Sequence, residues 1–212
     1  MIFAKQKLRP VAAAAALAAA LLAAAPQSAK AVVAYNNLGS SQDGSDPVFG
    51  VGPLAASFSS ASGGVLASLQ LLLTNGNSSA DPGSIDVRLI ADNHSSPGVV
   101  LADLGSIADK NITTSPAIYA LSFATPFVLA ANTEYWIELV SSAAPSAVEW
   151  SWSLDQSAPG VAGQQVFGQS FGVLPNSGGA YQFAVLVPEP GTVALFTGGL
   201  VALGLTRRSR AA

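Results

Sequence analysis

Residues 32–187 form a series of short segments in which apolar and polar residues alternate, and this pattern limits the fold more than any other feature. Ile85, Val87 and Leu89, for example, alternate with polar neighbours. A period of two residues is typical of a half-buried strand, and no segment here has a convincing helical period of 3.6 residues. Glycine, proline and asparagine clusters separate the segments, as turns require. The pattern predicts an all-β domain, an antiparallel β-sandwich that is jelly-roll-like.

The strand predictions differ in strength along the chain. Clear alternation predicts strands at residues 69–73, 84–89, 134–139 and 148–155. Weaker patterns predict strands at residues 32–36, 55–59, 99–104, 117–123, 165–171 and 181–187. Residues 36–52 are rich in glycine, serine and aspartate, so we expect this segment to be partly disordered.

Positive charge is concentrated at the two ends of the chain. Of the nine lysines and arginines, four lie within the first 30 residues and three within the last six. Residues 32–187 keep only Arg88 and Lys110 against eleven acidic residues, a net charge of −9. Such a segment repels phosphate groups, which argues against nucleic-acid binding, and it lacks a basic patch for anionic lipid.

The chain contains no cysteine. This excludes a disulfide framework, thiolate catalysis and cysteine-ligated zinc. The stability of the domain must therefore come from a packed core. The 156 residues between the two ends are enough to bury about two-thirds of their surface without cross-links.

The first 31 residues have the three parts of a secretory signal peptide in the usual order. The positive n-region contains Lys5, Lys7 and Arg9. Residues 11–25 form an apolar run of alanine, leucine and valine that is too short for a membrane anchor. Ala29 and Ala31 supply the small residues at positions −3 and −1 of a cleavage site. We therefore predict an N-terminal signal helix that is removed after Ala31; an alanine-rich helix of the folded domain is the alternative.

The last 25 residues, 188–212, also have three parts. Pro188, Glu189 and Pro190 come first, and two prolines cannot continue a strand or helix, so they separate the domain from the rest of the tail. Residues 192–205 are a short hydrophobic helix candidate of 14 residues, fewer than the ~20 that span a bilayer comfortably. The positive-inside rule places the basic cluster after this segment on the cytoplasmic side. This cluster contains Arg207, Arg208 and Arg210.

This order of parts resembles the PEP-CTERM sorting signal of Gram-negative bacteria. The resemblance implies that an exosortase, a membrane-embedded transpeptidase-like enzyme, recognises Pro188-Glu189-Pro190. It also implies export to the Gram-negative cell envelope, the outer surface or the extracellular matrix, because exosortase substrates are associated with exopolysaccharide and biofilm production. The expected partners are signal peptidase and an exosortase-type enzyme, with membrane contact through the C-terminal segment before processing. A plain hydrophobic tail is the alternative.

A second resemblance covers roughly residues 58–154. Residues 84–89 (Ser-Ile-Asp-Val-Arg-Leu), 96–98 (Ser-Pro-Gly) and 129–136, which contain the stretch Asn-Thr-Glu-Tyr-Trp, resemble the choice-of-anchor β domains, and the R-type most closely. Such domains occur on bacterial surface proteins that carry one of several interchangeable C-terminal anchors. The family has no assigned activity, so the resemblance implies no catalytic residues.

Tryptophans beside acids are the best candidates for a binding site. Trp136 lies between Glu134 and Glu138 on one strand face, and Trp150 and Trp152 come on the next predicted strand. An indole ring can stack on a sugar ring while carboxylates accept hydrogen bonds from the sugar hydroxyls, so these residues could bind a glycan such as exopolysaccharide. Packing of the rings in the core and solvation of the acids is the other interpretation, and we favour it.

Catalysis has weaker support in the sequence. Two of Glu134, Glu138 and Glu149 could act as the acid and base of a glycan hydrolase. A serine hydrolase triad would need His94, the only histidine, which lies in a polar loop without a Gly-x-Ser-x-Gly elbow. We therefore expect no catalytic residues and no enzymatic activity.

We also expect no metal and no cofactor, with one weak alternative. Five aspartates in or near loops could supply oxygen ligands for calcium, but no Asp-x-Asp-x-Asp-Gly spacing supports such a site. They are Asp43, Asp46, Asp81, Asp86 and Asp92. The sequence thus favours a non-enzymatic, exported envelope or biofilm-matrix protein. A carbohydrate-binding module for exopolysaccharide is the alternative, and a glycan hydrolase is less favoured.

Overall fold

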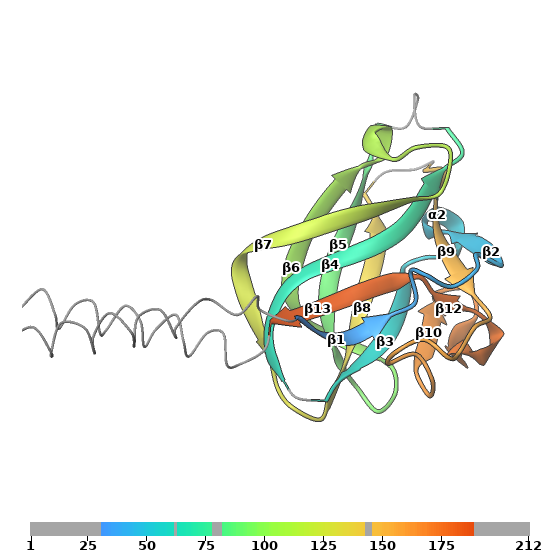
Figure 1. Cartoon of the computed structure of the whole chain (residues 1–212). Helices are drawn as coiled ribbons and strands as arrows, with labels where there is room; N and C mark the ends of the chain where they lie inside the picture. The colour runs from blue at the N-terminus through green and yellow to red at the C-terminus, as the bar shows by residue number, and fades with distance from the viewer. Residues whose placement is uncertain (1–30, 62, 78–81, 143–145, 189–212) are drawn as a thin grey trace, which may run out of the picture. The chain divides into compact units, whose positions relative to one another are not determined.

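The alternating segments fold into strands that form two antiparallel sheets facing each other, a β-sandwich (Figure 1). The computed structural model describes residues 31–61, 63–77, 82–142 and 146–188. Every strand pair within these residues is antiparallel. The prediction of an all-β sandwich is therefore confirmed.

The first sheet has seven strands. Its main path runs β1 (Ala31–Asn36), β13 (Phe183–Pro188), β4 (Gly64–Asn75), β9 (Val148–Ser153) and β12 (Ala180–Tyr181). Two more strands join this path, β7 (Ala117–Leu129) beside β4 and β2 (Gly44–Pro47) beside β9. The sheet therefore combines segments from both ends of the described chain.

The second sheet has six strands. Its order is β11 (Gly172–Pro175), β10 (Gln165–Gly168), β3 (Leu54–Ser60), β8 (Thr133–Ser141), β5 (Ser84–Asp92) and β6 (Pro97–Ala108). Among the residues that the structure describes, the helical elements are a single turn, α2 (Val48–Val51), and two 3-10 turns, η1 (Asp109–Asn111) and η2 (Asn176–Gly178). Within the described residues, no helix is long and apolar enough to cross a membrane.

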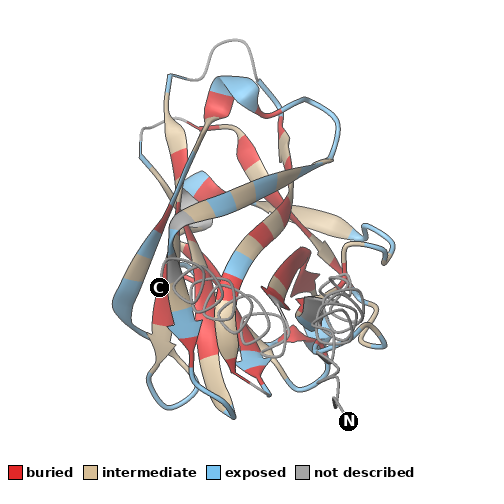
Figure 2. Cartoon of the chain, turned by 60° about the vertical axis from the view of Figure 1, so that its left-hand side comes forward, coloured by how far each residue is buried: buried red, intermediate tan, exposed pale blue. Residues whose placement is uncertain are grey.

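The core lies between the sheets and is built from the alternate residues that the sequence singles out. Leu69, Leu71 and Leu73 of β4 belong to the same core cluster as Ile85 and its alternate neighbours on β5, and all are fully buried. Figure 2 shows buried residues alternating with more exposed ones along several strands. Apolar side chains buried on both inner faces supply the hydrophobic stabilisation of the sandwich, as expected for a domain without disulfides.

Aromatic residues connect the beginning of the domain to its end. β1 pairs with β13 from Ala31 opposite Pro188 to Asn36 opposite Ala184. The ring of Tyr35 stacks on the ring of Phe183 with their centroids 3.9 Å apart, and its hydroxyl donates to the carbonyl oxygen of Tyr181. The described chain therefore enters and leaves the sandwich beside the same strand pair (Figure 1).

The expectation of partial disorder at residues 36–52 is wrong, because this segment contains β2 and α2. Its polar side chains bond to β9 and to the residues just after that strand. The Gln42 amide donates to Ser151 Oγ, and the Leu154 N–H donates to the Asp43 carboxylate at 2.7 Å. Polar composition alone misleads here, since the serines and aspartates find fixed partners across the sheet.

We predict that the Tyr35–Phe183 stack is a large contributor to stability. Tyr35→Ala should lower the free energy of unfolding by about 3–5 kcal/mol, because it leaves a cavity beside a buried ring. Tyr35→Phe should cost only about 1 kcal/mol, the value of one hydrogen bond. Guanidinium unfolding followed by tryptophan fluorescence measures both changes.

Val128→Ala, at a valine that is 69% exposed, is the control, and its effect should stay within about 0.5 kcal/mol. An equal effect of Val128→Ala and Tyr35→Ala would contradict this role.

Candidate functional site

The outer face of the six-stranded sheet carries three of the residues that the sequence selects for glycan binding. Glu134, Trp136 and Glu138 occupy alternate positions of β8 and point away from the main core. Trp136 is nevertheless 0% exposed, because it packs with Ala55 and Ile90 in a second, smaller cluster. Phe167 and Val173, from β10 and β11, add to this cluster.

A hydrogen bond also fixes the indole of Trp136. Its Nε1–H donates to Asp92 Oδ1 at 2.9 Å. With the ring enclosed and its polar atom satisfied, a sugar could stack on Trp136 only if the surrounding side chains moved. In this structure the indole ring of Trp136 is packed inside a cluster and has no surface exposed to a ligand.

The other two tryptophans lie on the inner side of the seven-stranded sheet. Trp150 is 0% exposed, stacks on Tyr181 and donates its indole N–H to the carbonyl oxygen of Gln182. Trp152 is half-buried, and it lies so close to Gly44 that a β-carbon there would come within 2.2 Å of its ring. The three tryptophans therefore do not form one exposed platform, and only Trp152 has any accessible surface.

The three candidate catalytic glutamates do not lie together at one site either. Glu149 lies on β9 in the seven-stranded sheet, where it accepts a hydrogen bond from Ser45 Oγ, whereas Glu134 and Glu138 lie on β8 in the six-stranded sheet. Each points outward from its own sheet, so Glu149 cannot pair with the other two across one substrate. Glu134 and Glu138 are four residues apart on one strand, about 13 Å between Cα atoms.

Glu138 is a partly buried acid on the outer face of the six-stranded sheet. Burial raises its pKa, and the guanidinium of Arg88, whose Nη1 lies 3.6 Å from Glu138 Oε2, opposes this rise through charge and hydrogen bonding. Since burial dominates, the ionised form is less stable here than in water. Arg88 therefore offsets part of the free-energy cost of ionising this half-buried acid.

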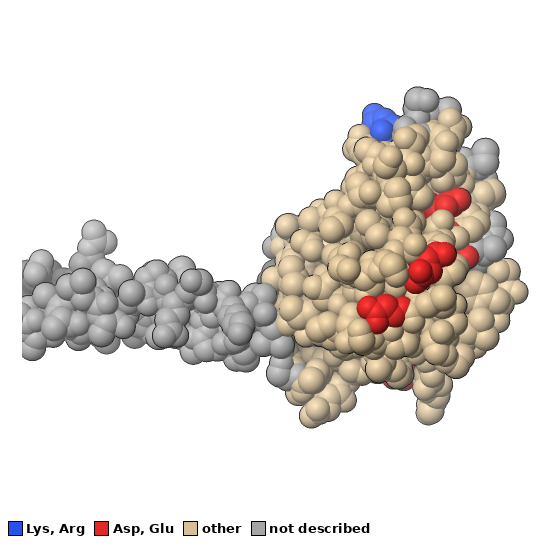
Figure 3. Space-filling view, turned by 45° about the vertical axis from the view of Figure 1, so that its right-hand side comes forward, with Lys and Arg blue, Asp and Glu red and all other residues tan. Residues whose placement is uncertain are grey.

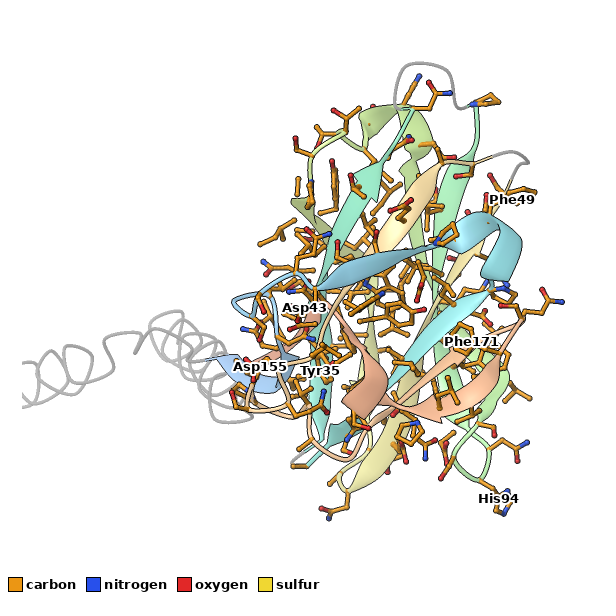
Figure 4. All side chains as sticks on the ribbon, turned by 90° about the vertical axis from the view of Figure 1, so that its right-hand side faces the viewer. Tyr35, Asp43, Phe49, His94, Asp155 and Phe171 are labelled. Atoms are coloured by element: carbon orange, nitrogen blue, oxygen red, sulfur yellow. The ribbon has the colours of Figure 1, made fainter. Side chains whose placement is uncertain are left out.

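Acidic side chains gather along one side of the molecule (Figure 3). Those on or beside β2 and β9 accept hydrogen bonds from the protein itself. Asp46 accepts from the Tyr181 hydroxyl, and Asp155 accepts from Ser40 and Ser157. Ser153 donates to Asp43 and accepts from the Asp155 N–H, and Figure 4 shows these two acids at the same corner. The acids thus hold the segment before β2 against β9.

The described residues contain no group of three or more histidines or acids placed to hold a metal ion. His94 lies in the turn between β5 and β6 and points away from the sandwich (Figure 4). It is exposed, and its ring Nδ1 lies 3.1 Å from Asn93 Oδ1. The expectation that His94 lies in an exposed loop is confirmed.

The structure shows one feature that the sequence does not indicate, a cavity of about 290 Å³ between β1 and the end of β3. The loop that connects β9 to β10 closes one side of it. Residues that line it include Val33, Val187, Ser59, Ser60, Ala162 and Gln164, and none of its lining residues is charged. These residues come from four separate parts of the chain, so no local motif marks them.

No protein-family model matches the chain, and a search of curated proteins finds no match either. The functional argument therefore depends on the residues and their geometry.

We predict opposite effects of pH on stability from Glu138 and Asp155. Burial raises the pKa of Glu138 above its ordinary value of 4.5, so the folded state favours the protonated carboxyl group. The resulting stabilisation is fully present below pH 4.5 and is lost as pH rises through the folded-state pKa. Glu138→Gln should remove this loss. Hydrogen bonds from the side chain and backbone of Ser157, and from Ser40, lower the pKa of Asp155 below 3.8. Its contribution is present above pH 3.8 and disappears as pH falls further.

Denaturant unfolding between pH 3 and 7 measures both effects. The wild-type protein and Glu138→Gln should diverge as pH rises above 4.5, and Asp155→Asn should flatten the acidic limb instead. The same pH dependence in all three proteins would contradict these assignments.

Proposed function

We propose that this chain is an exported, non-enzymatic protein of the Gram-negative cell envelope or biofilm matrix. In this proposal, signal peptidase removes residues 1–31 and an exosortase-type enzyme processes the tail at Pro188-Glu189-Pro190. The sequence features at the two ends support it. Ala29, Glu189, Pro190 and the arginine cluster lie outside the described residues, as do the two terminal helices that we expect.

The main structural support for the proposal is that the described core lies between the two predicted cleavage sites. The buried core residues begin at Tyr35 and end at Val187. Cleavage after Ala31 would leave the β1 pairs from Val32 opposite Val187 to Asn36 opposite Ala184, and a cut beyond Pro188 would leave β13 whole. Both end segments could therefore be removed without taking any of the core side chains that the structure describes.

The geometry of the strand pair also suits processing at both ends. Ala31 lies opposite Pro188 in the register of β1 and β13, so the two predicted cleavage sites adjoin neighbouring points of one strand pair. A domain attached in this way keeps its other surfaces free. The C-terminal segment 192–205 would contact the membrane until the tail is processed, and the jelly-roll-like sandwich would then face the exterior.

We predict that the mature protein begins at Val32 and ends near Pro188-Glu189-Pro190. Intact-mass spectrometry of protein from envelope and medium fractions measures both ends. Changing Pro188, Glu189 and Pro190 together to alanine should leave the C-terminus intact while the N-terminus is still processed. Pro175→Ala, a substitution at the end of β11, should leave both cuts unchanged. A C-terminus at Ala212 in the wild-type protein would contradict tail processing, and retention of residues 1–31 would contradict export by a signal peptide.

A further inference from the structure

Hydrogen bonds fix the segments that line the uncharged cavity between β1 and β3. The loop that closes it is fixed by the Asn36 N–H, which donates to the Pro159 carbonyl oxygen, and by the buried Asn176, whose Nδ2 donates to the Val161 carbonyl oxygen. Gln164 connects this loop to β3, because its Oε1 accepts from Ser57 Oγ and its Nε2 donates to Ser59 Oγ. The cavity is therefore formed before any ligand arrives.

Small residues keep this cavity open. Gly160 has a positive φ of 76°, and a β-carbon there would come within 2.2 Å of the Ala34 carbonyl oxygen. Most of the residues that line the cavity are alanine, serine or glycine, whose side chains are short or absent. A volume of about 290 Å³ is close to the lower end of the range for small-molecule sites, ~300 Å³. Such a space suits a ligand of about one six-membered ring with its substituents.

The chemistry of the lining limits the ligand. A charged ligand would lose its hydration without gaining a counter-ion, because no lining residue is charged. A purely apolar ligand would leave the hydroxyl of Ser59 and the amide of Gln164 facing carbon. Ser59 Oγ accepts from Gln164 and can still donate its own proton. Val33, which is 38% exposed, supplies an apolar contact beside these polar groups.

A peptide strand fits poorly, although β1 is an edge strand. The Asn36 N–H on that edge already bonds to Pro159, and Gly160 lies directly against the Ala34 carbonyl oxygen. The backbone groups that an added strand would need are therefore occupied at this point.

We propose that this cavity binds one neutral sugar ring, either a free monosaccharide or the end unit of a polysaccharide. The hydroxyls of the sugar would bond to Ser59 and Gln164, while a C–H face of the ring would contact Val33, which is 38% exposed. This inference goes beyond the proposed function and does not depend on export or on tail processing. It also places sugar binding away from the buried tryptophans.

Ligand-observed saturation-transfer NMR on the full-length protein tests this site. The probes are the methyl glycosides of glucose, galactose and mannose, with glucuronate as the charged comparison. At least one neutral glycoside should bind with a dissociation constant of about 1 mM, as expected for a ligand with few atoms, and glucuronate should bind at least tenfold more weakly. Displacement of the bound glycoside by its polymer would assign the site to a chain end; no displacement would assign it to a free sugar.

Two variants and a matched control locate the binding. Ala162→Phe fills the cavity from an exposed lining position and should weaken binding at least tenfold. Ser59→Ala removes one hydroxyl with little risk to folding and should weaken it severalfold. Ala120→Phe, at an exposed alanine of β7, should bind as the wild-type protein does. Saturation transfer from none of the three glycosides would overturn the proposal, as would binding that both cavity variants leave unchanged.

Discussion

The pairing of β1 with β13 is the constraint on which the rest of the structure depends. It brings the two ends of the described chain into one strand pair, from Ala31 opposite Pro188 onward, and places Tyr35 on Phe183. Without β1, the edge of β13 and the stacked face of Phe183 would be open to water. The sandwich has no disulfide to compensate for such a loss, so its closure depends on burial and strand pairing.

The same constraint links fold to function. Because the first and last strands are neighbours, the segments that carry the two predicted processing signals continue from the same strand pair of the seven-stranded sheet. The acids near β9 strengthen the neighbouring region, since Asp43, Asp46 and Asp155 each hold a segment from elsewhere in the chain. The acidic surface that composition suggests is therefore largely a set of structural hydrogen bonds.

The sequence predicts the strands well because alternation is a local signal. β4, β5, β8 and β9 all include their predicted residues, apart from Leu154 and Asp155 after β9. The burial of Trp136 could not be predicted, because β10 and β11 cover it from positions far along the chain. The cavity could not be predicted either, since Val33, Ser59 and Gln164 meet only after both sheets have formed.

The central claim is that the sandwich between the two predicted processing sites is complete in itself. The most direct test is guanidinium unfolding of a chain limited to residues 32–188, monitored by tryptophan fluorescence and circular dichroism. The account predicts one cooperative transition with a free energy of unfolding in the usual range of about 5–15 kcal/mol. A chain without a cooperative transition would contradict it, because the terminal segments would then be part of the fold.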